Sequence, residues 1–155
     1  MAANPTYGQL LALKGQGFIA NGILAASSGN LAAIQLWNPT GSGKILLLRN
    51  CVISVGAACF VQFGQNTTEL AAALGQGLNK LIGGAIGVGL IRGSNTAGGP
   101  TLGGIFGEPA IPSATALQLP FVDPIIVTAG NGLALVSQIA NVEMSAYFEW
   151  DEVNG

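Results

Sequence analysis

The sequence predicts an all-β fold, an antiparallel β-sandwich of jelly-roll-like type, from three observations. Short apolar runs recur about every ten residues with glycine or proline corners between them, which is typical of sandwiches and barrels. The closing run Val142–Val153 alternates apolar with polar residues, as a strand with one buried face does. The run Lys44–Val55 is apolar at both parities, which indicates a strand that is covered on both faces.

Lys44–Val55 is therefore expected to be a central strand of the sandwich, or a strand whose outer face meets another subunit. One parity is expected to hold Ile45, Leu47, Cys51, Ile53 and Val55, and the other Leu46, Leu48 and Val52. Arg49 falls on the first, apolar parity. Because a buried arginine needs a partner, we expect a salt bridge or a place in an interface, with Glu149 as the first candidate partner.

Local composition predicts the other elements. Turn formers at Asn38–Gly43, between the apolar runs Ala33–Trp37 and Lys44–Val55, predict two strands joined as a hairpin. A short helix is expected at Thr68–Leu74, between a capping threonine and a following glycine. The remaining strands are expected at Phe18–Ala25, Ala57–Phe63, Ala114–Leu119, Ile125–Val127 and Leu133–Gln138.

At 155 residues the chain is expected to form one domain, residues 1–155, with a sizeable core. Residues 1–15 are a candidate N-terminal arm, in which Gln9–Lys14 could form one helical turn. Residues 75–112 combine Gly, Ala, Leu and Ile with no clear period, and a long segment of that kind is usually functional. We interpret it as an apolar insertion that is ordered by packing on a neighbour. Its expected contacts are Ile82, Ile86, Val88, Leu90 and Ile91.

The composition favours a protein that is part of an assembly. Charged residues are 8% of the chain, against about 25% in an average globular protein. A free monomer uses surface charge to stay apart from its copies, so much of this surface is expected to lie against other protein. The five Lys and Arg residues are scattered, which argues against nucleic acid as a partner.

A membrane span and a signal peptide are not expected either. The most apolar long stretch, Leu70–Ile91, is interrupted by Gln76, Asn79 and Lys80, so it does not read as a membrane span. Met1–Gln9 carries no basic residue, so the start lacks the charged region of a signal peptide.

Two glycine motifs resemble nucleotide-binding signatures and fail on inspection. Gly15–Ala20 matches Gly-x-Gly-x-x-Ala, but the acidic residue needed about 20 positions later is absent, since the first acid is Glu69. Gly43-Lys44 lacks both the first glycine of a P-loop, where Asn38 stands, and the Ser or Thr after the lysine. No nucleotide cofactor is expected.

Few residues could carry catalysis. The chain has no histidine, which is the commonest general base and metal ligand. Glu149 and Asp151 share one face of the last strand, and a solvated face explains both carboxylates. We expect no enzyme activity, no cofactor and no metal. Whether Cys51 and Cys59 pair stays open, with buried thiols as the simpler interpretation.

Two motifs together resemble a known class of proteins. One is WNPTGSGKILLLRNCVIS at Trp37–Ser54. The other is the ending Ala129–Val153, a glycine corner followed by a last strand that closes on Trp-Asp-Glu-Val. The pair resembles small virion structural proteins of tailed bacteriophages, including capsid decoration (cement) proteins.

The resemblance implies a non-enzymatic homo-oligomer, expected to be a trimer, whose partner is the major capsid protein. It implies a place on the capsid surface of the virion after synthesis in the host cytoplasm. Many copies would stabilise the shell through many weak contacts acting together. A tail, baseplate or fibre-associated sandwich that recognises a host receptor is the alternative, and the number of copies per particle separates the two.

Overall fold

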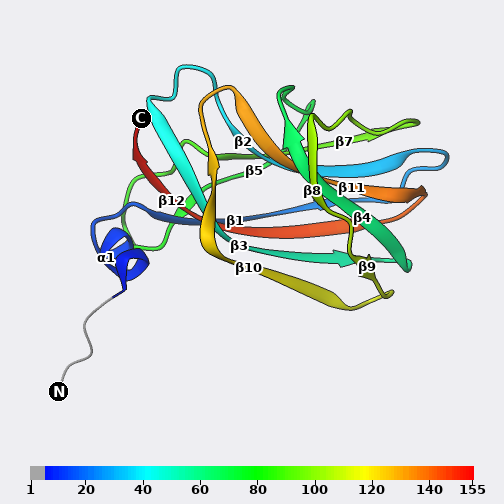
Figure 1. Ribbon diagram of the computed structural model, residues 1–155, viewed down its shortest axis with the longest axis horizontal. Coiled ribbons are helices and arrows are strands. Elements are labelled where there is room, and N and C mark those ends of the chain that lie inside the picture. The colour runs from blue at the N-terminus through cyan, green and yellow to red at the C-terminus, as the bar shows by residue number, and fades with distance from the viewer. Residues whose placement is uncertain (1–5) are drawn as a thin grey trace.

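The computed structural model, which describes residues 6–155, is a β-sandwich of two antiparallel sheets (Figure 1). One sheet has five strands in the order β10-β3-β12-β1-β6. The other has seven, in the order β5-β7-β2-β11-β4-β8, with β9 paired to β4. The predicted antiparallel sandwich is confirmed. The elements are α1 (Tyr7–Leu13), β1 (Gly17–Leu24), β2 (Leu31–Asn38), β3 (Lys44–Val55), β4 (Cys59–Asn66), β5 (Ala72–Gln76), β6 (Leu78–Asn79), β7 (Leu90–Thr96), β8 (Gly104–Gly107), β9 (Ala110–Ile111), β10 (Ala116–Val127), β11 (Asn131–Ala140) and β12 (Met144–Asn154).

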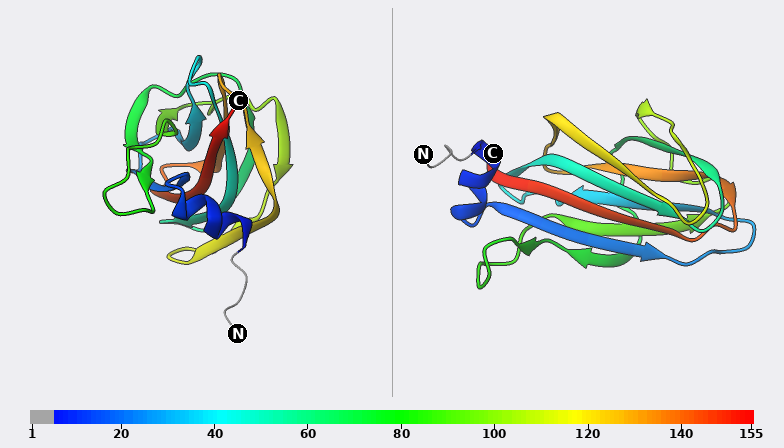
Figure 2. Two further views of the ribbon diagram at one scale, coloured as in Figure 1. Left: turned by 90° about the vertical axis from the view of Figure 1, so that its left-hand side faces the viewer. Right: turned by 90° about the horizontal axis from the view of Figure 1, so that it is seen from below.

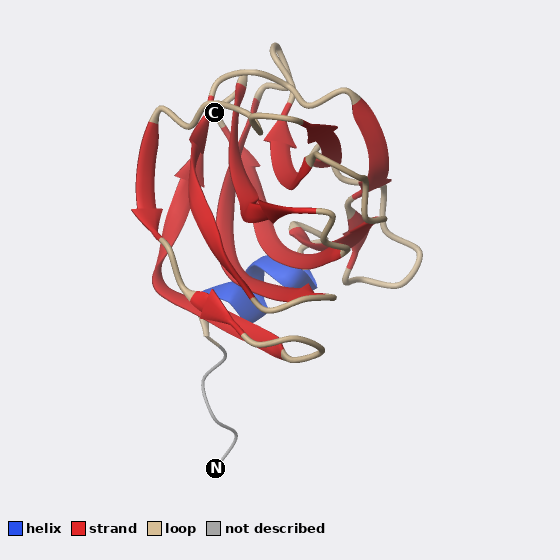
Figure 3. Ribbon diagram, turned by 90° about the vertical axis from the view of Figure 1, so that its right-hand side faces the viewer, coloured by secondary structure: helices blue, strands red, loops and turns tan. Residues whose placement is uncertain are grey.

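The core fills the space between the two sheets, which Figure 3 shows from one end of the strands. The last strand behaves as its alternation predicts, with Met144, Ala146, Phe148 and Trp150 all buried in that core. The largest fully buried side chains of the sandwich include Trp150, Phe148, Ile34, Leu36, Leu46, Leu48, Ile53, Leu133 and Leu135.

The expected hairpin between β2 and β3 is wrong, although its turn is correct. β2 pairs with β7 and β11, whereas β3 pairs with β10 and β12, so the two strands lie in different sheets. The chain crosses between the sheets at Asn38–Gly43. There Asn38 Nδ2 donates to the carbonyls of Lys44 and Val127, each at 2.9 Å. The same turn-forming residues occur in a hairpin and in a crossing between sheets, so they could not tell the two apart. Apolar residues of both strands are buried in the core between the sheets.

The expected parity of β3 is wrong, because β3 contains a β-bulge. Asn50 pairs with Glu149 and Leu48 pairs with Trp150, so Arg49 is an extra residue that has no opposite partner on β12. The core side of β3 therefore switches from Leu46 and Leu48 to Cys51, Ile53 and Val55. Arg49 points away from the core, which is how a charged side chain can occur in this apolar run.

Much of the segment 75–112 belongs to the sandwich itself. β7 pairs along β2, and its Ile91 is fully buried in the core, at 0% exposed. Leu102 packs, with Leu70, on Ala33 and Val136, on the outer face of the seven-stranded sheet. The short helix expected at Thr68–Leu74 is absent, because this stretch is irregular and then enters β5.

A buried glutamine and an arginine fix the segment that carries Leu70. Gln35 Nε2 donates to the carbonyl of Thr68 at 3.1 Å, and Gln35 Oε1 accepts from the amide of Leu70 at 3.0 Å. Arg92 Nε donates to the carbonyl of Leu70 at 2.9 Å. The chain thus covers one outer sheet face with its own segments.

Residues 6–15 of the expected arm form a docked helix, while residues 1–5 lie outside the described residues. Thr6 and Gln9 form a capping box at the start of α1, and Gly15 follows its end at φ +69°. Leu11 is buried, and Ala12 lies against Gly17 at the start of β1. α1 therefore packs at the end of the five-stranded sheet, at the same end of the sandwich as the C-terminus (Figure 2).

Candidate functional site

One end of the sandwich gathers exposed apolar side chains from two parts of the chain. α1 contributes Leu10 and Leu13, and the chain around β6 contributes the rest. Leu13 and Leu81 line one hollow together with Gln9, Ala12 and Lys80, which makes the two groups neighbours. We call this the helix-end surface, and it consists of Leu10, Leu13, Leu78, Leu81, Ile82 and Ile86.

The loop that carries this surface has a fixed base. The carboxylate of Glu152, only 5% exposed, accepts from the amide of Gly89 at 3.0 Å and from the indole of Trp150 at 3.1 Å. The two sides of the loop are hydrogen-bonded to each other, because the Gly87 amide donates to the Gly77 carbonyl at 2.9 Å. Ile82, at 99% exposed, therefore extends into solvent from a loop whose base is hydrogen-bonded to β12.

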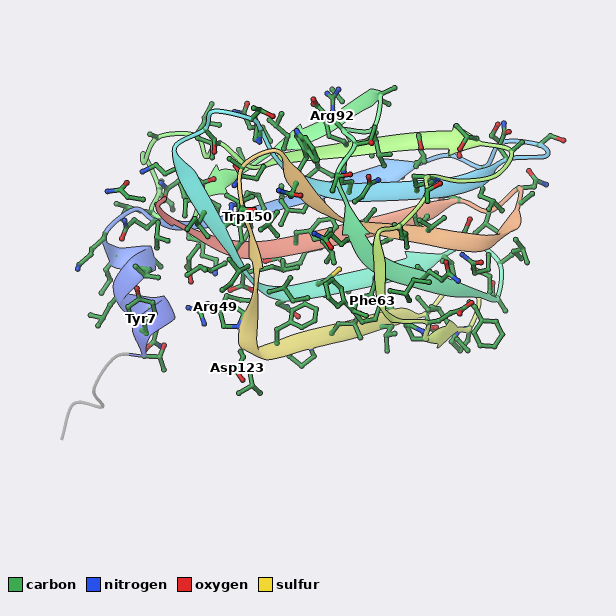
Figure 4. The ribbon with its side chains drawn as sticks, turned by 45° about the horizontal axis from the view of Figure 1, so that its top comes forward. Tyr7, Arg49, Phe63, Arg92, Asp123 and Trp150 are labelled. Atoms are coloured by element: carbon green, nitrogen blue, oxygen red, sulfur yellow. The ribbon has the colours of Figure 1, made fainter. Side chains whose placement is uncertain are left out.

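A charged groove lies beside the helix-end surface, under α1. Arg49 Nε donates to Asp151 Oδ2 at 2.8 Å, and Lys80 Nζ pairs with Glu149 Oε1. The Tyr7 ring lies 5.9 Å from the Arg49 guanidinium carbon, a cation–π distance (Figure 4). Each cation in the groove is paired with one carboxylate, so the net charge of the groove is close to zero.

The expected partner of Arg49, Glu149, is wrong, although the expected salt bridge exists. The bulge turns Arg49 toward Asp151, the outward residue that follows Trp150. Glu149 instead pairs with Lys80, which comes from the loop after β6. No pattern in the local sequence predicts that Lys80 contacts the last strand.

Replacing Arg49 by Met is expected to lower the free energy of unfolding by about 2 kcal/mol, because the Asp151 carboxylate loses its charged donor. The Asp151 side chain is only 3% exposed, so water cannot fully replace the guanidinium. Urea unfolding followed by circular dichroism measures this loss. The double variant Arg49→Met/Asp151→Asn is the control and should recover part of it. Equal stability of Arg49→Met and the unchanged protein would contradict the ion pair.

The structure separates the contact residues that the sequence suggested. Ile82 and Ile86 are exposed and available to a partner. Val88 packs against the core, and Leu90 is half-buried in β7. Ile91 cannot meet a partner, because β7 places it between the sheets. Sequence reasoning missed Leu10, Leu13, Leu78 and Leu81, whose exposure depends on how α1 and β6 dock.

The described residues offer little for catalysis or metal binding. Within residues 6–155 no group of three His, Cys, Asp or Glu side chains comes together as a metal site would require. Cys51 and Cys59 are both free thiols on strands of different sheets. Burial raises the pKa of each thiol, most strongly at Cys51, so the reactive thiolate is disfavoured.

The fold and the helix-end surface define a class of protein. It is an antiparallel β-sandwich with exposed apolar side chains at one end, beside a groove in which the charges of two ion pairs cancel. No family model, curated protein or solved structure matches the chain. Across residues 6–155, no helix combines the length and apolar character that crossing a membrane needs.

Proposed function

We propose that this protein is a non-enzymatic structural component of a phage virion, a capsid decoration or cement protein that binds the head shell. The observation that carries the proposal is the helix-end surface, where Ile82 is 99% exposed on a loop with a fixed base. Exposed apolar groups that gather on one surface mark protein contact sites, because burying them against a partner removes apolar area from water. The low charge of the chain and its resemblance to such proteins support the same function.

We further propose that the sandwich is a jelly roll. The strand order supports it: β1, β12, β3 and β10 are neighbours in one sheet, and β2, β11, β4 and β8 are neighbours in the other. Successive strands of this set of eight alternate between the sheets, except that β4 and β8 follow one another as neighbours in the same sheet, which is the pattern of a jelly roll. β5, β6 and β7 lie between β4 and β8 in the chain, so Leu78, Leu81, Ile82 and Ile86 of the helix-end surface belong to an insertion in this frame, while Leu10 and Leu13 come from α1.

A decoration protein of this kind acts through repetition. Fully burying one isoleucine side chain is worth about 1.5–3 kcal/mol, so Ile82 and Ile86 give each copy a modest affinity. Copies that also contact one another on the shell bind as a multivalent set, and the total resists disruption far better than one contact. The major capsid protein is the partner in this proposal, and the capsid surface is the location.

The double variant Ile82→Asp/Ile86→Asp tests this function. It is expected to melt like the unchanged protein, since both side chains are exposed, and to lose retention on capsids that lack the protein. Co-sedimentation with such capsids measures retention. The matched control is Ile105→Asp, a similarly exposed isoleucine on β8, which should stay bound. Equal retention of the double variant, or no binding by the unchanged protein, would refute the proposal.

The alternative, a tail, baseplate or fibre-associated protein that recognises a receptor, has one observation in its favour. Three aromatic side chains, Tyr7, Phe60 and Phe106, are exposed, and exposed aromatics are common in recognition surfaces. The number of copies per particle separates the two functions, because a cement protein covers the whole shell and a tail part occurs in few copies.

A further inference from the structure

We propose that a second copy of this chain packs on the outer face of the five-stranded sheet. This inference rests on the proposed function only in taking the protein as part of an assembly, and it names the surface through which copies pair. The outer sheet face is formed by the residues of β1, β3 and β12 that alternate with core residues, and β10 extends it beyond β3. On the first three strands these residues are Ile19, Asn21, Ile23, Ile45, Leu47, Asn50, Val52, Ser54, Ser145, Tyr147, Glu149, Asp151 and Val153.

Six of these thirteen outward residues are aliphatic, namely Ile19, Ile23, Ile45, Leu47, Val52 and Val153. An antiparallel sheet with one face in water normally carries polar residues on that face. Here Ile19 on β1 and Leu47 and Val52 on β3 are only half-buried, with β12 between the two strands, while Ile23 is largely exposed. On β3 the aliphatic residues Ile45, Leu47 and Val52 face outward, and within residues 6–155 α1 covers only one end of this face (right panel of Figure 2).

The opposite side of the sandwich shows what such a face looks like when the chain covers it. There Leu70 and Leu102 close over Ala33 and Val136, and both Ala33 and Val136 are buried. Among the described residues, no comparable segment crosses β3 and β12 on the outer sheet face. Cover from another molecule is the remaining way to remove these side chains from water.

The charges near this face favour a second copy over a charged partner. Arg49 is paired with Asp151, and Glu149 with Lys80, so the acids and cations at the end of the face are neutralised inside one molecule. A neutral face meets its own image without repulsion. A shell that recognised this face through charge would need unpaired charges on it.

The size and shape of the face fit a pair. Four neighbouring strands spaced ~4.8 Å, each at least eight residues long at ~3.3 Å per residue, make a face of about 20 by 26 Å. In flat projection this is about 520 Å², so the whole face has to take part for each partner to approach the ~800 Å² buried in a standard interface. Ile23, Val52 and Tyr147 line an open hollow toward the end of the face away from α1, which can receive side chains of the other copy. Because one face meets itself, the contact has two-fold symmetry and replaces the trimer that the resemblance implies.

Light scattering behind a sizing column, over a range of concentrations, tests the pairing. The unchanged protein is expected at about twice the 15.6 kDa of one chain. Val52→Lys places an unpaired charge in the contact and is expected to give single chains with an unchanged circular dichroism spectrum. Ile23→Lys, at a more exposed position on β1, serves if Val52→Lys does not fold.

Two controls make the outcome specific. Val52→Thr keeps the size of the side chain without a charge and should remain paired. Gln65→Lys adds the same charge on the other sheet and should also remain paired. Single chains or a trimer for the unchanged protein, or pairing in both lysine variants, would overturn the proposal. Ile82→Asp/Ile86→Asp should stay paired while losing shell retention, so failure of this inference and failure of the proposed function are distinguishable.

Discussion

Replacing Trp150 by Ala is expected to lower the free energy of unfolding by about 4 kcal/mol, the largest effect of a single change considered for this chain. Trp150 is fully buried and its ring stacks on Phe18 with 6.1 Å between centroids. Its indole also donates to Glu152, which holds the amide of Gly89. One change therefore removes core volume and leaves a buried carboxylate with one donor fewer. For a domain of this size, such a loss lowers the melting temperature by about 10 °C or more.

Thermal and urea unfolding, followed by circular dichroism, measure this loss without depending on tryptophan fluorescence. Phe60→Ala is the matched control, because Phe60 is an aromatic strand residue that is more than half exposed. Its change should stay within about 1 kcal/mol, since a partly exposed ring leaves no cavity. Trp150→Phe should fall between the two, as it keeps a ring and loses the bond to Glu152. Similar losses for Trp150→Ala and Phe60→Ala would contradict the central place of Trp150.

The strands could be predicted because their signals are local. The alternation of the last run placed Met144, Phe148 and Trp150 in the core, and the apolar run Lys44–Val55 is β3 with the same bounds. The partners of those strands could not be predicted. Asn38–Gly43 contains turn formers whether the chain folds back or crosses to the other sheet, and only contacts distant in sequence decide between the two.

Irregular backbone hid other features from the sequence. The bulge at Arg49 reverses the parity of half of β3, and no residue type marks it. Thr68–Leu74 has the composition of a short helix, yet Gln35 and Arg92 hold its first half as a loop over the seven-stranded sheet. Tertiary contacts overrode local propensity there.

The candidate site was predicted only in part, for the same reason. The apolar character of Ile82 and Ile86 in a segment without a period indicated a contact surface, and both side chains are exposed. Ile91 shares that composition but lies in β7, whose pairing with β2 carries it into the core. The pair Lys80–Glu149 joins residues 69 positions apart, so it depends on the complete fold.

Replacing Gly64 by Ala is expected to lower the free energy of unfolding by about 3 kcal/mol and to detach β8 from the sheet. Gly64 lies on β4 opposite Ile105, and a Cβ at this position would run into the backbone carbonyl of Gly104. The added methyl would also crowd Leu102, which packs on the outer face of the seven-stranded sheet. A backbone neighbour cannot rotate away as a side chain can, so the strands must separate.

Gly104→Ala tests whether this effect comes from the close approach at Gly64 or from loss of a glycine as such. A Cβ at Gly104 meets nothing within 4 Å, so its stability should change by no more than about 0.5 kcal/mol. Hydrogen exchange at Gly104–Gly107 should quicken in Gly64→Ala and stay slow in Gly104→Ala, because only the first variant opens the pairing of β4 with β8. If both variants keep the exchange rates and stability of the unchanged protein, the tight contact between these two strands is wrong.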